Sequence, residues 1–463
     1  MNHDLIIIGG GPAGYLAAER AGKAGLSVAL CEERSLGGVC LNEGCIPTKT
    51  LLYSAKLHDG VANGQRYGVS AQELRIDHAA VLRRKDKVVR TLVAGVKAAL
   101  RASQVTVYEA RAVITGKGPE GFTVQAGETA LTGKRLLIAT GSSPALPPIP
   151  GLKEGLERGF VLTSREILDK KEVPQQLVVI GGGVIGLELA SYFRSIGARV
   201  AVVEMLDHIA GENDQELVAL LKADMEKRGI TFHLSARVTA IEEGGVRFEQ
   251  GGDSHLLACD SVLLSIGRRA NTQELGLDTI QVEVQRGAIP VDDHLRTNVP
   301  GVYAAGDVTG HSMLAHTAYR EAEVAVNHML GIPDHMRYEA VPAVLYTSPE
   351  LASVGETEQT AAKKGLPFQV VKLPMRFSGR YLAENEGGNG LLKLLVHTRS
   401  QQVLGAQVLS NYASEFIVLV GTYIELGLTL QQIQKIIFPH PTVSEIIREA
   451  VFAYEPASQE VDK

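Results

Sequence analysis

The fold of the chain is decided by the stretch Asp4-Leu5-Ile6-Ile7-Ile8-Gly9-Gly10-Gly11-Pro12-Ala13-Gly14. Its first half is a continuous apolar run, which is typical of a strand buried on both faces of a parallel sheet. The glycines follow at once, and an alanine-rich helix continues to Ala24. Because glycine allows a tight turn and lets a pyrophosphate approach the helix N-terminus, this order predicts a dinucleotide-binding β-α-β unit.

An acidic residue completes this unit. A second strand, Ser27 to Cys31, ends at Glu32, whose carboxylate can accept hydrogen bonds from a ribose. A glycine motif alone is weak evidence, but the strand, the helix and the acid together are specific. The residues predicted to bind the first nucleotide are Gly9, Gly11, Gly14 and Glu32.

The same arrangement recurs in the middle of the chain. Gln176 to Ile180 is an apolar strand, and Val200 to Val203 is a second strand that ends at Glu204. In both copies, 23 residues separate the first glycine from the acidic residue. This internal repeat predicts a second nucleotide. Its predicted binding residues are Gly181, Gly183, Gly186 and Glu204.

Two cysteines, Cys40 and Cys45, lie just after the first unit. On an ideal helix, five residues would separate their Cα atoms by more than the roughly 4.4–6.8 Å that a disulfide spans. A helix on which the pair can bond must therefore start with a distorted turn, and Gly44 supplies the freedom for it. Beside a dinucleotide site the pair predicts a redox disulfide. Two buried, unpaired thiols are the structural alternative.

Length and composition set limits on the function. The 463 residues suffice for about three domains, and 45% hydrophobic with 21% charged residues is typical of globular cores. A formal charge of −6 favours neither nucleic acid nor an anionic membrane as a partner. No apolar run approaches the roughly 18 residues of a spanning helix. Since a strand begins by Leu5, we expect no signal peptide, and four cysteines favour a reducing cytoplasm.

The cysteine stretch carries a family resemblance. Gly-Gly-x-Cys-Leu-Asn-x-Gly-Cys-Ile-Pro-x-Lys, at residues 37–49, resembles the redox motif of the two-cysteine pyridine nucleotide-disulfide oxidoreductases. The similarity continues through several motifs along nearly the whole chain and is greatest to the members that oxidise dihydrolipoamide. It implies FAD and NAD as cofactors, no metal, a homodimer, and a lipoyl-carrying partner from a 2-oxoacid dehydrogenase complex or the glycine cleavage system.

The resemblance also implies the architecture. We expect an α/β fold with two Rossmann-like domains, 1–144 for FAD and 145–268 for NAD. A central domain, 269–339, would complete the FAD site, and 340–463 would form a C-terminal α+β dimerisation domain. Between the glycine units, Gln72 to Arg101 predicts a long amphipathic helix, and a small meander follows it.

Further site residues are implied by the family motifs. Asp307 ends a segment that resembles the second flavin motif, although a strand that ends in a Gly-Asp turn is common. Met313 to Ala318 opens a helix that, in the family, would point its N-terminus at the flavin, and His316 on it is expected only to pack. The additional cofactor-binding residues are Thr140, Gly141, Asp307, Ala315, Glu188 and Gly267.

The resemblance assigns catalytic roles as well. Cys40 would exchange with the substrate, and Cys45 would lie nearer the flavin. Lys49, paired with Glu188, would favour the Cys45 thiolate. His440 and Glu445 would form the acid/base pair, delivered across the dimer interface. The sequence departs from many relatives at Phe438, where they carry a second histidine; this puts a flanking contact in doubt, not the base.

Other functions remain open at this point. A related flavin disulfide reductase could act on a glutathione-like disulfide or mercuric ion with NAD(P)H. Two features argue against such a reductase. Glu204 would repel the 2′-phosphate of NADP, which these relatives usually prefer. Mercuric reductases also carry a pair of cysteines near the C-terminus, whereas the last cysteine of this chain is Cys259. We interpret Cys31 and Cys259 as structural. The chain could also be a binding subunit of a complex, but the redox stretch and the His-Glu pair argue against that as its sole role.

Overall fold

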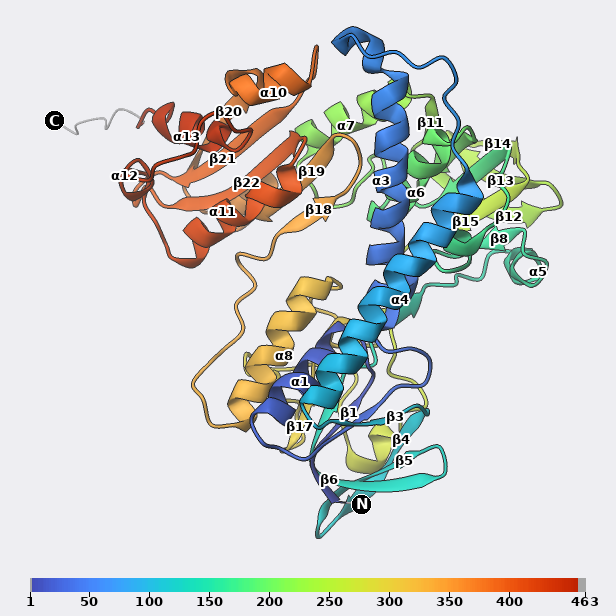
Figure 1. The fold of residues 1–463 in the computed structure, drawn as a ribbon, viewed down its shortest axis with the longest axis vertical. Helices are drawn as coiled ribbons and strands as arrows, with labels where there is room; N and C mark the ends of the chain where they lie inside the picture. Colours follow the sequence, from blue (N-terminus) through green and yellow to red (C-terminus); the bar gives the residue numbers. More distant parts are fainter. Residues whose placement is uncertain (1, 457–463) are drawn as a thin grey trace.

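The computed structural model describes residues 2–456, which form three lobes (Figure 1). The first lobe contains the N-terminal strand, the second the middle of the chain, and the third the C-terminal segment. Two long helices, α3 (Cys45–Ala62) and α4 (His78–Ala102), pack against each other between the first and second lobes.

The first lobe is built on a seven-stranded sheet with β1 (Asn2–Ile8) at its centre, between β2 and β6. The other strands are β2 (Val28–Cys31), β3 (Thr106–Tyr108), β4 (Ala112–Gly118), β5 (Gly121–Ala126), β6 (Thr129–Ile138) and β17 (Val302–Ala304). Strands β3, β2, β1, β6 and β17 are parallel, whereas β4 and β5 are antiparallel. β6 pairs with β5 over residues 129–133 and with β1 over residues 132–138, so one strand joins the meander to the nucleotide-binding sheet.

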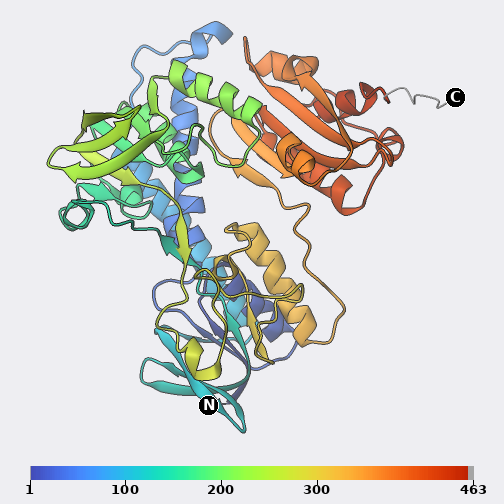
Figure 2. The same cartoon turned by 180° about the vertical axis from the view of Figure 1, so that it is seen from behind.

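Helices α1 (Pro12–Lys23) and α8 (Ala315–Met329) pack side by side on this sheet, as both views show (Figure 1 and Figure 2). Small buried residues, among them Ala17 and Ala322, allow the close approach. The short helix α2 (Gly38–Glu43) precedes α3.

The second lobe repeats the first. Its parallel sheet has the order β11-β10-β9-β15-β8, beside an antiparallel meander β12-β13-β14. The strands are β8 (Val161–Leu162), β9 (Gln176–Ile180), β10 (Arg199–Val203), β11 (Ile230–His233), β12 (Ala236–Glu242), β13 (Gly245–Gln250), β14 (Asp253–Ala258) and β15 (Ser261–Leu264). The helices are α5 (Leu152–Glu157), α6 (Val184–Ser195) and α7 (Gln215–Lys227).

The chain crosses between these lobes twice, and the crossing segments β7 (Ser142–Pro144) and β16 (Arg268–Ala270) pair antiparallel. After β16 the chain returns to the first lobe. Leu275, Ile289 and Val302 pack in one core with Ile6 and Ile138. The segment predicted as a central domain therefore shares the hydrophobic core of the first lobe.

The third lobe is an antiparallel sheet of order β18-β19-β22-β21-β20, flanked by helices. Its strands are β18 (Ala343–Leu345), β19 (Glu350–Gly355), β20 (Phe368–Pro374), β21 (Leu391–His397) and β22 (Val403–Ser410). Its helices are α9 (Glu358–Lys363), α10 (Gly379–Glu384), α11 (Ala413–Glu425), α12 (Leu430–Ile433) and α13 (Glu445–Phe452). Leu345, Leu351 and Leu409 belong to the main core of the second lobe, so the two lobes are packed together.

The α/β class with two dinucleotide-binding units and a C-terminal α+β unit is confirmed. One helix boundary was wrong: α4 begins at His78, not at Gln72. The carboxylate of Asp77 accepts the backbone N–H of Ala80 at 2.9 Å, so it caps the helix there. Across residues 2–456, no helix is both long and apolar enough to span a membrane.

Candidate active site

The first glycine turn is shaped for close backbone approach. A Cβ atom on Gly9, where φ is +106°, would lie 2.3 Å from the carbonyl oxygen of Ala139, and one on Gly14 would lie 1.8 Å from that of Gly9. By contrast, the nearest atom to a Cβ on Gly11 would be 3.8 Å away. The turn is thus closed against the sheet but open in front of α1, as a pyrophosphate at the helix N-terminus requires.

Glu32 is held at this turn by backbone donors. Its Oε2 accepts the N–H of Gly10 at 2.7 Å, and its Oε1 accepts the N–H of Arg34 at 2.8 Å. Oε1 also accepts the N–H of Ser35 at 3.2 Å. A carboxylate has about four acceptor positions, so one remains for a ribose hydroxyl. The residues predicted for the first nucleotide therefore lie together and fit it.

The second turn repeats this geometry residue for residue. Oε2 of Glu204 accepts the N–H of Gly182 at 2.6 Å, and Oε1 accepts the N–H of Leu206 at 2.8 Å. A Cβ on Gly186 would lie 2.3 Å from the carbonyl oxygen of Gly181, whereas one on Gly183 would meet nothing within 4 Å. The second turn therefore fits a second dinucleotide.

Thr140 and Gly141 are tied to the return segment by a residue that the sequence analysis missed. The backbone carbonyl of Asn271 accepts a hydrogen bond from the Thr140 hydroxyl at 2.7 Å. The side-chain amide of Asn271 donates to the backbone carbonyl of Thr140 at 2.9 Å. The backbone N–H of Asn271 donates to Gly141. Gly267 lies just before this segment at φ +120°, a conformation that favours glycine.

Asp307 lies in a polar cluster at the crossing between the lobes. It accepts a hydrogen bond from the hydroxyl of Ser142 at 2.5 Å, and Arg268 donates to that hydroxyl at 2.7 Å. Burial lowers the pKa of Arg268, while the charge of Asp307 opposes this effect. Ser142 belongs to no local sequence motif. The only sequence signal for Arg268 is its position directly after Gly267.

Glu321 of α8 is a buried carboxyl next to this cluster. One oxygen accepts the N–H of Gly306 at 2.5 Å, and the other accepts the hydroxyl of Tyr338 at 2.8 Å. Burial raises the pKa of Glu321 to about 7. The same helix begins at Ala315, the residue predicted to approach the flavin.

The distorted turn predicted between the cysteines is present. Helix α2 ends at Glu43, Gly44 adopts φ −149° and ψ −103°, and α3 begins at Cys45. Gly38, at φ +57°, explains part of the motif, because a Cβ there would lie 2.6 Å from the Cα of Gly11. The cysteine segment is therefore packed directly on the first glycine turn.

Cys40 and Cys45 are free thiols in hydrogen-bond contact. The hydrogen bond to Cys45 and burial raise the pKa of Cys40. The hydrogen bond from Cys40 lowers the pKa of Cys45 against the effect of burial, and the charge of Lys49 adds to the lowering. Of the two thiols, Cys45 is therefore the one that loses its proton more readily, and Cys40 is its hydrogen-bond donor.

Lys49 forms the expected ion pair with Glu188. Its Nζ lies 2.8 Å from Oε2 and 3.1 Å from Oε1 of Glu188, whose side chain is only 4% exposed. The backbone N–H of Tyr346 also donates to Glu188 at 2.9 Å, and the ammonium stands 4.3 Å from the centre of the Tyr346 ring. The cysteine helix, the second lobe and the third lobe meet at this carboxylate.

His440 and Glu445 form a pair in the third lobe. The His440 Nδ1 lies 2.8 Å from Oε1 of Glu445, and Oε2 accepts the N–H of Thr442 at 2.7 Å. Burial acts to raise the pKa of Glu445, but the hydrogen bonds from Thr442 and His440 outweigh this effect, and the pKa is lowered. The His440 side chain is 79% exposed, so its ring is available to a second molecule.

Glu445, the partner of His440, begins α13, and the buried residues of this helix pack in the core of the third lobe. In both views the red segment that contains α13 lies at the outer edge of the third lobe, away from the start of α3 (Figure 1 and Figure 2). Of the other residues singled out, Phe438 packs on the third-lobe core, and His316 hydrogen-bonds the carbonyl of Pro342 at 2.7 Å. Cys31 and Cys259 are buried, and burial raises the pKa of each to about 12.

Two family models match the chain. The pyridine nucleotide-disulphide oxidoreductase model matches residues 3–322, and the dimerisation domain of the same group matches residues 341–451. The match to the dimerisation domain supports the predicted homodimer. The predicted oxidoreductase class is confirmed, as are FAD and NAD, the cofactors of this family.

Individual proteins agree with these matches. The chain is 39% identical to a dihydrolipoyl dehydrogenase of Chlamydia muridarum, over 96% of each chain, and 36% identical to one of Cupriavidus necator, over 98% of each. Among solved structures, LpdA from Mycobacterium tuberculosis has a TM-score of 0.88 at 27% identity, covering 97% of this chain and 99% of its own. The HOCl-induced flavoprotein disulfide reductase RclA from Escherichia coli has a TM-score of 0.85 at 28% identity, over 98% and 100%. With its two glycine turns, its cysteine pair and its third lobe all matched, the chain belongs to the pyridine nucleotide-disulphide oxidoreductase family.

Proposed function

We propose that the protein is a dihydrolipoyl dehydrogenase, which oxidises protein-bound dihydrolipoamide to lipoamide and reduces NAD⁺ to NADH. The observation that carries the proposal is the cysteine pair packed on the first glycine turn, in which the pKa values of Cys40 and Cys45 are driven in opposite directions. This asymmetry suits a disulfide that one thiol opens and the other leaves as an anion.

The chain's own residues would hold both nucleotides. FAD would lie on the turn of Gly9, Gly11 and Gly14, with Glu32 at its ribose and Asp307 and Ala315 toward its flavin half. NAD would lie on the turn of Gly181, Gly183 and Gly186, with Glu204 at its adenine ribose. When bound, FAD would supply the acceptor for the electron pair of the reduced cysteines, and NAD⁺ would supply the final acceptor, which takes up a hydride.

The substrate thiol must lose its proton before it can attack a disulfide. The partner's His440, oriented by Glu445, would accept that proton at Nε2. The resulting thiolate bonds to the sulfur of Cys40, the Cys40–Cys45 bond breaks, and Cys45 leaves as a thiolate that the charge of Lys49 stabilises. The second substrate thiol then bonds to the first substrate sulfur, the bond between that sulfur and Cys40 breaks, and lipoamide is released. Of the two substrate protons, one is then on Cys40 and the other on the partner's His440, while Cys45 remains the anion.

The domain limits follow the same proposal: 1–144, 145–268, 269–339 and 340–463. The pairing of β7 with β16 at the crossing supports the limits near 144 and 268. The pairing of β17 with β6 supports the role of 269–339 in completing the first lobe. We further propose a cytoplasmic location and a lipoyl-carrying protein as the partner, either of a 2-oxoacid dehydrogenase complex or of the glycine cleavage system. The low cysteine count supports the reducing compartment.

Steady-state rates decide between this activity and the related disulfide reductases. The same FAD-loaded preparation is assayed with dihydrolipoamide and NAD⁺, and with glutathione disulfide and NADPH. We expect turnover with the first pair to exceed that with the second by at least a hundredfold. Faster turnover of the second pair would overturn the proposal.

A further inference from the structure

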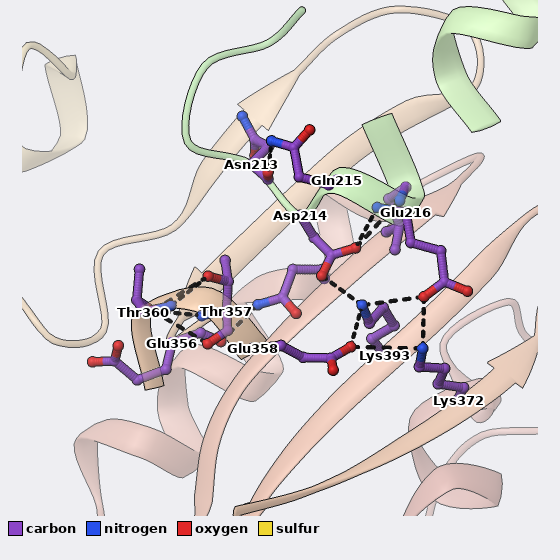
Figure 3. Close-up of polar contacts among 12 residues, drawn as sticks. Asn213, Asp214, Gln215, Glu216, Glu356, Thr357, Glu358, Thr360, Lys372 and Lys393 are labelled. Carbon is purple, nitrogen blue, oxygen red and sulfur yellow. Dashed lines mark hydrogen bonds and ion pairs between the residues drawn. The ribbon is translucent and has the colours of Figure 1, made fainter. Parts of the chain in front are cut away.

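A cluster of charged residues joins the second lobe to the third (Figure 3). At its centre is Lys393 of β21, whose side chain is 2% exposed. Its ammonium lies 2.6 Å from Oδ2 of Asp214 and 3.2 Å from Oε2 of Glu216, and it also bonds Glu358. An ammonium has three N–H donors, so each finds its own carboxylate.

Asp214 uses both of its oxygens in this cluster. It is fully buried, and while Oδ2 faces Lys393, Oδ1 caps α7 by accepting the N–H groups of Glu216 at 3.1 Å and Leu217 at 3.3 Å. The start of α7 is therefore held against the sheet of the third lobe. Figure 3 shows Asp214 and Glu216 reaching from the second lobe toward Lys393 and Lys372.

The arrangement of charges makes this contact specific. Lys372 and Lys393 are direct partners on the neighbouring strands β20 and β21, where like charges repel. Glu216 bridges them, since it lies 2.8 Å from the Nζ of Lys372 and 3.2 Å from that of Lys393. The face of the third lobe thus carries positive charge that the acidic residues at the start of α7 complement.

The segment that leads to Asp214 comes from the second nucleotide turn. It begins at Glu204, whose Oε1 accepts the N–H of Leu206, and it returns to the turn where the N–H of Ala210 donates to the carbonyl of Gly182 at 2.8 Å. Farther on, the amide of Asn213 donates to the Ala210 carbonyl at 2.6 Å and accepts from the hydroxyl of Ser353 at 3.4 Å. Loop 205–214 is therefore anchored at one end on the turn and at the other on the third lobe.

We infer that Asp214 and Lys393 are positioning residues for NAD⁺: by fixing loop 205–214 to the third lobe, they hold the carboxylate of Glu204 in place for the ribose. The inference rests on the proposed NAD site. The cluster is not needed merely to hold the two lobes together, because Leu345, Leu351 and Leu409 already join them through an apolar core. A buried ion pair adds little to stability over such a core, but it does define a geometry.

The test compares NAD⁺ binding by the FAD-loaded dimer and by Asp214→Asn. Asparagine is also a good N-cap, but its amide cannot both cap α7 and accept from the ammonium of Lys393. By calorimetric titration we expect the Kd for NAD⁺ to rise about tenfold, the size of one lost hydrogen bond to a charged group. The KM for NAD⁺ should rise with it, while FAD content, dimer mass and the rate of flavin reduction by dihydrolipoamide stay unchanged.

Lys372→Met is the matched control, since this half-exposed lysine belongs to the cluster but does not contact Asp214. Its Kd for NAD⁺ should stay within twofold of wild type. Where Asp214→Asn does not yield a folded dimer, Asn213→Ala replaces it in the same titration. This variant removes the hydrogen bonds of the Asn213 side chain to Ala210 and to Ser353 of the third lobe and leaves Asp214 and Lys393 in place. A severalfold rise in Kd is expected.

Glu204→Ala separates failure of the inference from failure of the proposed site. Weaker NAD⁺ binding in Glu204→Ala with wild-type binding in Asp214→Asn, or in Asn213→Ala where that variant is used, overturns the positioning role and leaves the NAD site standing. Wild-type binding in Glu204→Ala removes the site, and the inference with it. An equal loss of FAD and NAD⁺ in Asp214→Asn would show general disorder and also overturn the inference.

Discussion

Lys49 Nζ lies 2.8 Å from Oε2 of Glu188, a carboxylate on a different nucleotide-binding unit. The pair connects the cysteine helix α3 to α6, and the N–H of Tyr346 ties the same carboxylate to the third lobe. Together with the apolar packing of α3 on α6, this buried carboxylate therefore helps to fix the cysteine pair relative to the second nucleotide turn. Because Lys49 also lowers the pKa of Cys45, the contact links the geometry of the site to its chemistry.

Lys49→Met should lower the fraction of Cys45 that is thiolate at neutral pH, and it should destabilise the protein. Without the ammonium, the pKa of Cys45 rises, so alkylation of the reduced enzyme at Cys45 should be severalfold slower at neutral pH. Leaving Glu188 with one donor fewer should cost about 1–3 kcal/mol, less than for a fully buried pair because Lys49 is 33% exposed. Alkylation rate against pH and urea unfolding measure the two effects.

Lys56→Met is the control for this variant, because Lys56 is an exposed residue of the same helix. It should alter neither the alkylation profile nor the midpoint of unfolding. An unchanged alkylation profile in Lys49→Met would show that its charge does not act on the cysteines.

The active site should be completed by the partner subunit. Cys45→Ser and His440→Gln chains are each expected to be inactive, yet a hybrid dimer contains one site with both residues intact. Random exchange between equal amounts should restore about a quarter of the wild-type activity, since half of the dimers are hybrids with one working site each. Subunit exchange is verified by native mass spectrometry. Hybrids that form but remain inactive would place His440 in the site of its own chain.

Glu321 should make stability depend on pH between about 5 and 7. Its pKa is raised to about 7, whereas an unfolded glutamate titrates near 4.5. The folded state therefore binds more protons in this window, so stability is greatest below it and falls as pH rises, by about 3 kcal/mol at most. In Glu321→Gln this fall should disappear, as measured by urea unfolding of the FAD-loaded protein at a series of pH values. The exposed Glu172→Gln should keep the wild-type slope, and a wild-type slope in Glu321→Gln would contradict the assignment.

Nicotinamide preference should rest on Glu204. Its carboxylate, held by Gly182 and Leu206, can accept both ribose hydroxyls and repels a 2′-phosphate. Hydrogen bonds to charged groups contribute about 1.5–3 kcal/mol each, which corresponds to a preference for NAD⁺ over NADP⁺ on the order of a hundredfold. The ratio of kcat/KM values in wild type and Glu204→Ala tests this. A ratio that the mutation leaves unchanged would exclude Glu204 from the site.

The sequence predicts the parts of the site that depend on local geometry. The strand-glycine-helix units and the break at Gly44 follow from backbone conformation within a few residues, and the structure contains both. Asn271, Ser142 and Arg268 were missed because their contacts join residues 126 to 165 positions apart, and no short pattern records such contacts. Lys393 and Asp214, 179 positions apart, are a further example. The start of α4 was wrong for a local reason, the cap at Asp77.

The proposed activity depends most on Cys40 and Cys45 as the acceptor of the substrate's electrons. The direct measurement is alkylation of the oxidised, FAD-loaded enzyme before and after one equivalent of dihydrolipoamide without NAD⁺, with the labels located by mass spectrometry. We predict an unlabelled, bridged Cys40–Cys45 peptide before addition and two labels on that peptide afterwards, with Cys31 and Cys259 unchanged. Free thiols at Cys40 and Cys45 before addition, or no new label on them after it, would contradict the account.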